Sequence, residues 1–199
     1  MSESIELSQV YTADWFRRRE RYRPVYHAFA RAIEDVFHPT SILDVGCGAG
    51  YLLEYFINGG IDCRGVDGSP AALAALRPDI RARCYRVDLG LRPASPDPDI
   101  AVDLAVCVEV AEHIPEPLLP VCLSWFSAAR RLLLTAAPPG QRGNHHVNCR
   151  PPYYWIGALA AIGFRHDGPL TEKWKARAHG LTSGCPWVVR NALYFERYP

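Results

Sequence analysis

The chain has 199 residues, of which 49% are hydrophobic and 22% are charged. This composition is typical of a folded domain and excludes general disorder. The 22 Lys and Arg nearly balance the 21 Asp and Glu, so the overall charge provides no strong attraction to nucleic acid or to an anionic membrane. The sequence contains no CxxC pair, no recognisable signal peptide and no apolar run long enough to span a membrane. We therefore expect a cytoplasmic protein without a zinc ribbon.

Short apolar runs alternate with helical patterns along the chain, which predicts β–α–β units and a mainly parallel sheet. Strands are expected over residues 41–46, 61–67, 81–88, 102–108, 131–136, 164–166 and 187–195. Helices are expected over residues 19–37, 51–58, 70–76, 117–128 and 153–161, and loops over 91–99 and 171–180. Ligands of open parallel sheets bind beyond the carboxyl ends of the strands, so the loops that follow them are the candidate sites.

The first predicted strand ends in a glycine-rich turn, Gly46 to Gly50, that opens the next helix. Glycine tolerates positive φ and lets a ligand approach the backbone closely. The turn reads GxGxG and lacks the Lys-Ser/Thr of a P-loop, which removes most of the support for nucleoside triphosphate binding. An acid ends each of the next two strands. Asp67 is suited to accept hydrogen bonds from both ribose hydroxyls, and Asp88 to meet an adenine amino group. Either acid alone is as well explained by a helix cap, but together with the turn they favour a nucleoside cofactor.

Four segments resemble the motifs of class I S-adenosylmethionine-dependent methyltransferases, in the same order: Ile42–Leu52, Gly65–Ser69, Tyr85–Asp88 and Asp103–Ile114. The resemblance implies an α/β fold with a Rossmann-like, seven-stranded, mainly parallel sheet flanked by helices and an antiparallel C-terminal hairpin. It also implies a methyltransferase domain over residues 41–199 and an N-terminal helical segment, residues 1–40, that covers the cofactor site.

The same resemblance implies S-adenosylmethionine as the cofactor. It assigns cofactor-binding roles by position to Tyr11, Asp44, Gly46, Cys47, Gly48, Asp67, Gly68, Asp88, Leu89, Val108 and Glu109. Trp15 and Tyr22 also precede the first strand, and an aromatic face near the sulfonium would gain a cation–π contact. Packing in the core explains each of these aromatic residues slightly better.

Candidate catalytic groups lie in two loops that leave neighbouring strands. Glu109, Glu112 and His113 stand at i, i+3 and i+4, a spacing that places them on one side of a helical turn, and His145 and His146 follow the fifth strand. In one interpretation, His113, His145 or His146 is a general base. In another, Glu109, Glu112, His113 and His145 or His146 bind a divalent metal, with Mn, Fe, Co or Zn suited to these ligands. In a third, the acids favour a helix start and the histidines orient loops.

The ExxEH pattern followed by a downstream His resembles small-RNA 2′-O-methyltransferases and ubiquinone-pathway O-methyltransferases, where such residues hold a metal. We expect an S-adenosylmethionine-dependent methyltransferase that modifies a small-molecule acceptor, with oxygen as the first choice of acceptor atom. One alternative is a metal-dependent RNA 2′-O-methyltransferase, which the near-zero net charge disfavours. The other is a non-catalytic S-adenosylmethionine-binding protein, which would have no use for the crowded His and Glu loops.

Overall fold

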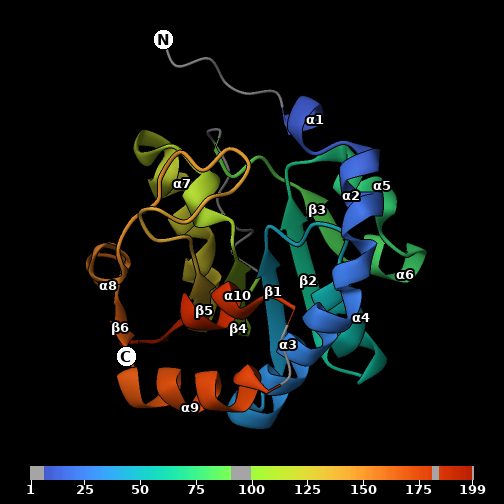
Figure 1. Ribbon diagram of the computed structural model, residues 1–199. Coiled ribbons are helices and arrows are strands. Elements are labelled where there is room, and N and C mark those ends of the chain that lie inside the picture. Colours follow the sequence, from blue (N-terminus) through green and yellow to red (C-terminus); the bar gives the residue numbers. More distant parts are fainter. Residues whose placement is uncertain (1–6, 91–99, 181–183, 199) are drawn as a thin grey trace.

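The computed structural model describes residues 7–90, 100–180 and 184–198 (Figure 1). One seven-stranded sheet runs through its centre in the order β3-β2-β1-β4-β5-β7-β6. In chain order the strands are β1 (Ser41–Val45), β2 (Asp62–Asp67), β3 (Cys84–Arg86), β4 (Val102–Val108), β5 (Ala129–Thr135), β6 (Phe164–His166) and β7 (Leu193–Arg197). Strands β1 to β5 pair in parallel, whereas β7 runs antiparallel to both β5 and β6. The predicted fold class is confirmed.

Helices cover both faces of the sheet. They are α1 (Leu7–Val10), α2 (Ala13–Arg19), α3 (Arg23–Phe37), α4 (Tyr51–Asn58), α5 (Pro70–Ala75), α6 (Pro78–Arg81), α7 (Leu119–Ser124), α8 (Pro152–Ala160), α9 (Gly168–His179) and α10 (Pro186–Arg190). One apolar cluster joins the sheet to α3, α4 and α9 through Phe29, Leu53 and Trp174. A second cluster joins the other face to α7 and α8 and includes Trp155 and Leu159. The sheet is therefore buried on both sides, as the apolar strand runs require.

Two predicted elements near the C-terminus differ from the structure. The segment predicted as a loop over 171–180 belongs to helix α9, because Thr171, Trp174 and Ala178 form a buried stripe at helical spacing and Asp167 caps its first turn. The strand predicted over 187–195 begins only at β7, since residues 186–190 form helix α10. Pro186 stands in the first turn of α10, where its missing N–H does no harm.

Smaller differences concern the ends of elements. Helix α3 begins four residues later than predicted, after a 3₁₀ turn at Glu20–Tyr22. Strand β3 is confined to Cys84–Arg86, so it ends before Asp88. The predicted helix over 117–128 is divided into α7 and flanking 3₁₀ turns. The loop predicted over 91–99 lies outside the described residues.

Helix α1 and the start of α2 lie toward the carboxyl ends of the strands, on one side of the molecule (Figure 1). Helix α3 packs into the main core through Phe29 and Ile33, whereas α2 buries only Phe16. The division of the chain at residue 40 stays a prediction. None of the helices in the described ranges is both long enough and apolar enough to cross a bilayer.

Candidate functional site

The glycine loop between β1 and α4 adopts a backbone conformation that is unfavourable for residues with a side chain. Gly46, Gly48 and Gly50 have φ values of 83°, 53° and 72°, a region that favours glycine. A Cβ atom on Gly46 would fall 2.4 Å from Cγ2 of Val110, and one on Gly50 would fall 2.6 Å from Cδ2 of Leu76. The loop therefore needs glycine both for its turn and for its close packing.

Asp67, at the end of β2, is tied directly to this loop. Its carboxylate accepts a hydrogen bond of 2.8 Å from the backbone N–H of Gly48 and another of 2.8 Å from that of Ser69. Burial raises the pKa of Asp67, and these two N–H groups offset part of the increase. Each carboxylate oxygen has a further lone pair, so the group remains able to accept from ligand hydroxyls.

Asp44 lies at the neighbouring strand end and is only 4% exposed. Burial and the charge of Asp67 raise the pKa of Asp44 to about 8, and no described residue donates a hydrogen bond to its side chain. An ammonium group of a ligand would supply the missing positive charge. The two acids thus offer complementary partners for a molecule with both an amine and vicinal hydroxyls.

The N-terminal segment lies over this loop. A Cβ atom built on Gly48 would meet Cε1 of Phe16 at 3.5 Å. The hydroxyl of Ser69 donates a 3.1 Å hydrogen bond to the carbonyl of Tyr11, whose ring stands edge-on to His113 with centroids 6.2 Å apart. Burial and the charges of Asp67 and Glu112 raise the pKa of Tyr11 to about 12. Tyr11 therefore lies between the glycine loop and the predicted catalytic groups.

The remaining predicted cofactor residues have varied surroundings. The carboxylate of Asp88 accepts the backbone N–H two residues later at 2.9 Å and so closes a turn. Leu89, Val108 and Cys47 are at most 9% exposed, and Gly68 is half-buried next to Asp67. Their roles toward a cofactor stay predictions.

Glu112, His113 and His146 form the candidate metal centre. Each offers one ligand atom, and these atoms all lie within 4.8 Å of one another. The side chain of Glu112 is fully buried, and neither of its carboxylate oxygens has a hydrogen-bond partner. Burial and the charge of Glu109 raise the pKa of Glu112 to about 8, and the nearby backbone N–H groups of Glu112 and Ala137 offset part of the increase without reaching hydrogen-bond geometry. Buried carboxylates are rarely left without partners, and such a group needs a proton or a cation.

The two imidazoles are oriented by backbone carbonyls. Nδ1 of His113 lies 3.1 Å from the carbonyl oxygen of His145, and Nδ1 of His146 lies 3.1 Å from that of Gln141. Because a carbonyl only accepts, each Nδ1 carries a proton, and in the neutral form of the ring Nε2 keeps a lone pair. Burial lowers the pKa of His113 to about 4, so its ring is neutral at pH 7. Neutral imidazoles oriented in this way are the usual form of metal-binding histidines.

Glu109 lies outside this group. It has a φ of 52°, and the 3₁₀ turn begins only two residues later, so the predicted alignment of Glu109 with Glu112 on one helical turn is not formed. The carboxylate of Glu109 accepts from Nε2 of Gln141 at 2.9 Å and from Nδ2 of Asn191 at 3.1 Å. Sequence reasoning missed both amides, since they lie far along the chain and belong to no recognisable motif.

His145 contributes through its backbone. Its ring is exposed and its φ is 55°, while its carbonyl fixes His113. Two backbone bonds join this loop to the loop after β4, because the N–H groups of Val147 and Asn148 donate to the carbonyl of Glu112 at 3.0 and 2.9 Å. The two loops therefore converge, as the sequence predicts.

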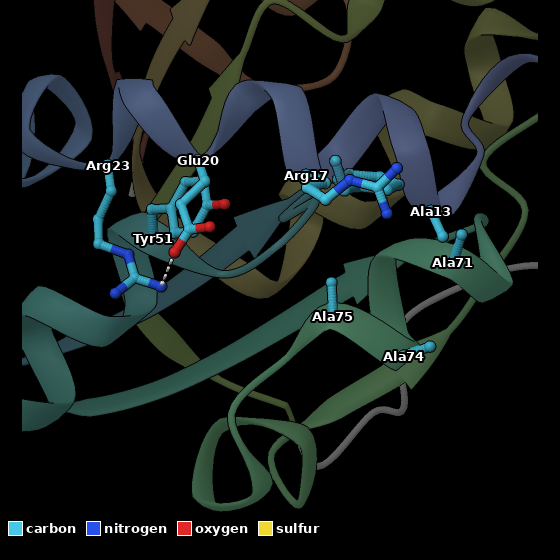
Figure 2. A pocket seen from close by; sticks show the side chains of 9 residues that line it. Ala13, Arg17, Glu20, Arg23, Tyr51, Ala71, Ala74 and Ala75 are labelled. Carbon is cyan, nitrogen blue, oxygen red and sulfur yellow. Dashed lines mark ion pairs between the residues drawn. The ribbon is translucent and has the colours of Figure 1, made fainter.

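A groove of about 270 Å³ lies beside the N-terminal segment, between α2, α4 and α5 (Figure 2). Alanines of α2 and α5 face each other across it, and Arg17, Arg23, Glu20 and Tyr51 complete its walls. Arg17 pairs with Asp14, and Arg23 lies 3.5 Å from Glu20 and 3.5 Å from Glu54. The arginines of this groove are thus already neutralised by carboxylates of the protein.

Comparisons with known proteins agree with this arrangement. A family model described as "Methyltransferase domain" matches residues 43–134. The ubiquinone biosynthesis O-methyltransferase of Stutzerimonas stutzeri is 24% identical over 157 residues, which are 75% of this chain and 63% of that protein. An uncharacterized methyltransferase of Mycolicibacterium paratuberculosis is 34% identical over 173 residues, which are 80% of this chain and 64% of that protein. The chain thus spans less than two thirds of these curated relatives.

The fold is shared with a sugar N-methyltransferase from Streptoalloteichus, whose structure matches with a TM-score of 0.68 at 16% identity and covers 94% of this chain and 93% of that one. The family model covers the glycine loop, both strand-end acids and the ExxEH turn. The strand order and the antiparallel final pair match the plan implied by those motifs. The family model, the relatives and the fold together support the class I S-adenosylmethionine-dependent methyltransferase superfamily for this chain.

Proposed function

We propose that this chain transfers a methyl group from S-adenosylmethionine to a hydroxyl of a small-molecule acceptor, and that Glu112, His113 and His146 hold a divalent metal at the reaction site. The observation that carries the metal proposal is the fully buried carboxylate of Glu112, which has no hydrogen-bond partner and lies among two imidazoles. The superfamily supports the methyl donor.

The residues present fit the methyl donor. Asp44 has no hydrogen-bond donor among the described residues and would receive the methionyl ammonium, and Asp67 would receive the ribose hydroxyls. The charge of Asp67 acts on Tyr11, and the ring of Tyr11 packs edge-on against His113. This ring would therefore cover the sulfonium. Methyl transfer depends mainly on holding the acceptor atom in line with the methyl group, so such rigid positioning supplies much of the rate.

The residues present also fit a metal. Two imidazoles and one carboxylate suit Mn, Fe, Co or Zn better than Ca or Mg. When bound, such a cation would act as a Lewis acid and lower the pKa of an acceptor hydroxyl. His113, with its pKa near 4, is a weak base at neutral pH, and this favours the ligand role over the general-base role for its ring. Glu109 would keep its hydrogen bonds to the side-chain amides of Gln141 and Asn191.

Both the proposed metal centre and the names of the relatives favour oxygen as the acceptor atom. Deprotonation assists attack by a hydroxyl far more than by an amine that is already neutral, so a metal centre is most useful for oxygen. Relatives of this chain are named ubiquinone biosynthesis O-methyltransferases. A formal net charge of +1 favours a small acceptor over a nucleic acid.

The test uses protein purified without a histidine tag. Metal content is measured by mass spectrometry, and methyl transfer from labelled S-adenosylmethionine is measured against a panel of phenols, catechols, amines and thiols. We expect bound metal, methylated oxygen in the product, and loss of both in Glu112→Gln and His146→Ala. His145→Ala is the matched control and should keep both, because the site uses only the backbone carbonyl of that residue.

Each part of the proposal can fail separately. Full activity of metal-free protein would eliminate the metal, while methylated products found only at nitrogen or sulfur would eliminate the hydroxyl acceptor. Loss of metal in the His145→Ala control would mean that the group of ligands has been assigned wrongly.

A further inference from the structure

The imidazole of His146 is fixed by neighbours from its own loop, the loop after β5. Its Nδ1 lies 3.1 Å from the carbonyl oxygen of Gln141 and 3.5 Å from Sγ of Cys149. Its ring stands beside the backbone of Gly143, at the position that a Cβ atom would take there. Only 13% of the side chain is exposed, so the direction in which Nε2 points is decided by this loop rather than by solvent.

Gly143 leaves the space that the imidazole occupies. A Cβ atom on this residue would fall 2.1 Å from Nε2 of His146, 2.3 Å from Cε1 and 2.7 Å from Cδ2. Non-bonded carbon atoms pack best at about 3.5–4.0 Å, so a methyl group and the ring exclude each other. The φ of Gly143 lies outside the left-handed region, and the turn itself therefore accepts other residues. The close approach of the ring is what requires glycine here.

A side chain at position 143 would act on His146 more than on the fold. The imidazole is the end of a rotatable side chain, so it can swing away from an added methyl group into another rotamer without moving the backbone. Such a swing takes Nε2 away from the carboxylate of Glu112, which lies 3.9 Å from it. The expected result is a folded protein in which Glu112, His113 and His146 no longer form one group.

The other contact of the ring, the carbonyl of Gln141, belongs to a residue whose side chain is held at both polar ends. Nε2 of Gln141 donates to Glu109 at 2.9 Å, and Oε1 of Gln141 accepts from Nδ2 of Asn191 at 3.0 Å. Nδ2 of Asn191 also donates to Glu109 at 3.1 Å, so the three side chains close a ring of hydrogen bonds. Asn191 is 8% exposed and directly follows α10. A buried amide at the end of a helix thus anchors the residue that orients His146.

We infer that Gly143 and Asn191 are the positioning residues of His146. Gly143 leaves room for the ring, and Asn191, acting through Gln141, holds the carbonyl that keeps a proton on Nδ1. Nε2 is then the nitrogen that faces Glu112. The role of this nitrogen as a metal ligand rests on the proposed function, whereas the position of the ring does not.

The test compares Gly143→Ala and Asn191→Ala with one matched control each. Gly157→Ala adds the same methyl group at a place where no atom of the described residues beyond its own helix lies within 4 Å. Asn144→Ala removes an exposed amide from the same loop. Nitrogen NMR of the imidazoles, in EDTA at about pH 8.5, where most are neutral, reports which nitrogen of His146 carries the proton. The signal is identified by its loss in His146→Ala. Calorimetry with Co²⁺ measures metal affinity, and melting temperatures establish that every variant is folded.

We expect the wild type and both controls to show the Nδ1–H form of His146. Gly143→Ala and Asn191→Ala should show a mixture of the two tautomers. Both should bind Co²⁺ at least tenfold more weakly, because losing a group that orients a ligand typically lowers metal affinity by about 10- to 100-fold. The melting temperature of metal-free Gly143→Ala should stay close to that of wild type, which distinguishes a displaced ring from a damaged fold. A variant that keeps the wild-type NMR signal would overturn the role of its residue, as would a wild type whose proton lies on Nε2.

This inference and the proposed function can fail separately. A wild-type protein that binds no Co²⁺ would refute the metal of the proposed function, and the NMR signals of the metal-free protein would still decide the roles of Gly143 and Asn191. Unchanged signals in a protein that does bind Co²⁺ would refute those roles and leave the proposed function intact.

Discussion

Oε1 of Glu112 and Nε2 of His146 face each other at 3.9 Å, which is too long for a hydrogen bond. His146 is held from behind by the carbonyl of Gln141, which fixes the proton on its other nitrogen. The carboxylate therefore receives no proton from the imidazole. Two groups with lone pairs therefore face each other in a buried position, so the charge of Glu112 is costly unless a proton or a cation neutralises it.

Without metal, Glu112 should make the stability of the protein depend on pH. Its pKa is about 8 in the folded state against an ordinary value of 4.5, so its contribution is complete below pH 4.5 and is lost as pH rises toward 8. Glu112→Gln removes this dependence. In EDTA, the variant should gain about 2–4 kcal/mol in unfolding free energy relative to wild type between pH 5 and pH 8. Urea denaturation measures this, and a difference that does not vary with pH would contradict it.

Asp67→Asn should weaken binding of the cofactor product. The carboxylate accepts from Gly48 and Ser69 and, in the proposed function, from ribose hydroxyls. Hydrogen bonds to a charged group contribute about 1.5–3 kcal/mol, so the affinity for S-adenosylhomocysteine should fall by about 10- to 100-fold. Calorimetry measures the loss. Asp79→Asn is a suitable control, because its carboxylate pairs with Arg77 on the surface, and an equal loss in both variants would refute the specific role.

Gly46→Ala should destabilise the fold more than Gly60→Ala. Both glycines have similar φ values, 83° and 80°, so the conformational strain is matched at about 1 kcal/mol. A Cβ atom at Gly46 would collide with Val110 at 2.4 Å, whereas at Gly60 no atom lies within 4 Å. Overpacking adds about 1–3 kcal/mol, which thermal denaturation of the two variants would resolve. Equal melting temperatures would show that Val110 moves aside freely.

Asn191→Ala should loosen the carboxylate of Glu109. The Asn191 amide is 8% exposed and donates to Glu109 at 3.1 Å and to the side-chain oxygen of Gln141 at 3.0 Å. Loss of these bonds should lower the free energy of unfolding by about 1–3 kcal/mol. The exposed Asn144 provides a control substitution that should be neutral in the same denaturation experiment. An unchanged stability in Asn191→Ala would indicate that water replaces the amide.

The strand ends were predictable because local patterns determine them. Buried runs such as Ile42–Val45 and Leu104–Val108 end where a glycine or an acid follows, and parallel pairing then brings those ends to one edge. The glycine loop and Asp67 were found for this reason. Helix α9 escaped prediction because its charged residues outnumber the three that are buried, so its periodicity was hidden by composition.

The hydrogen-bond partners of Glu109, in contrast, could not be predicted from local sequence patterns. Gln141 lies 32 residues and Asn191 82 residues away in sequence, and nothing local marks an amide as the partner of a distant acid. Likewise, the choice among the histidines depends on which backbone carbonyl each ring meets, and on the positive φ that turns the ring of His145 outward. Such contacts follow from tertiary packing, which sequence spacing does not encode.

The carbonyl of Glu112 accepts the N–H groups of both Val147 and Asn148, and this has a mechanical consequence. Glu112, whose side chain faces the histidines, joins the loops after β4 and β5 through its backbone carbonyl, so the two loops are mechanically coupled. Amide hydrogen exchange at Val147 and Asn148 should therefore occur only when the β4 loop opens as well. If either loop moves to admit small molecules, we expect both to move together.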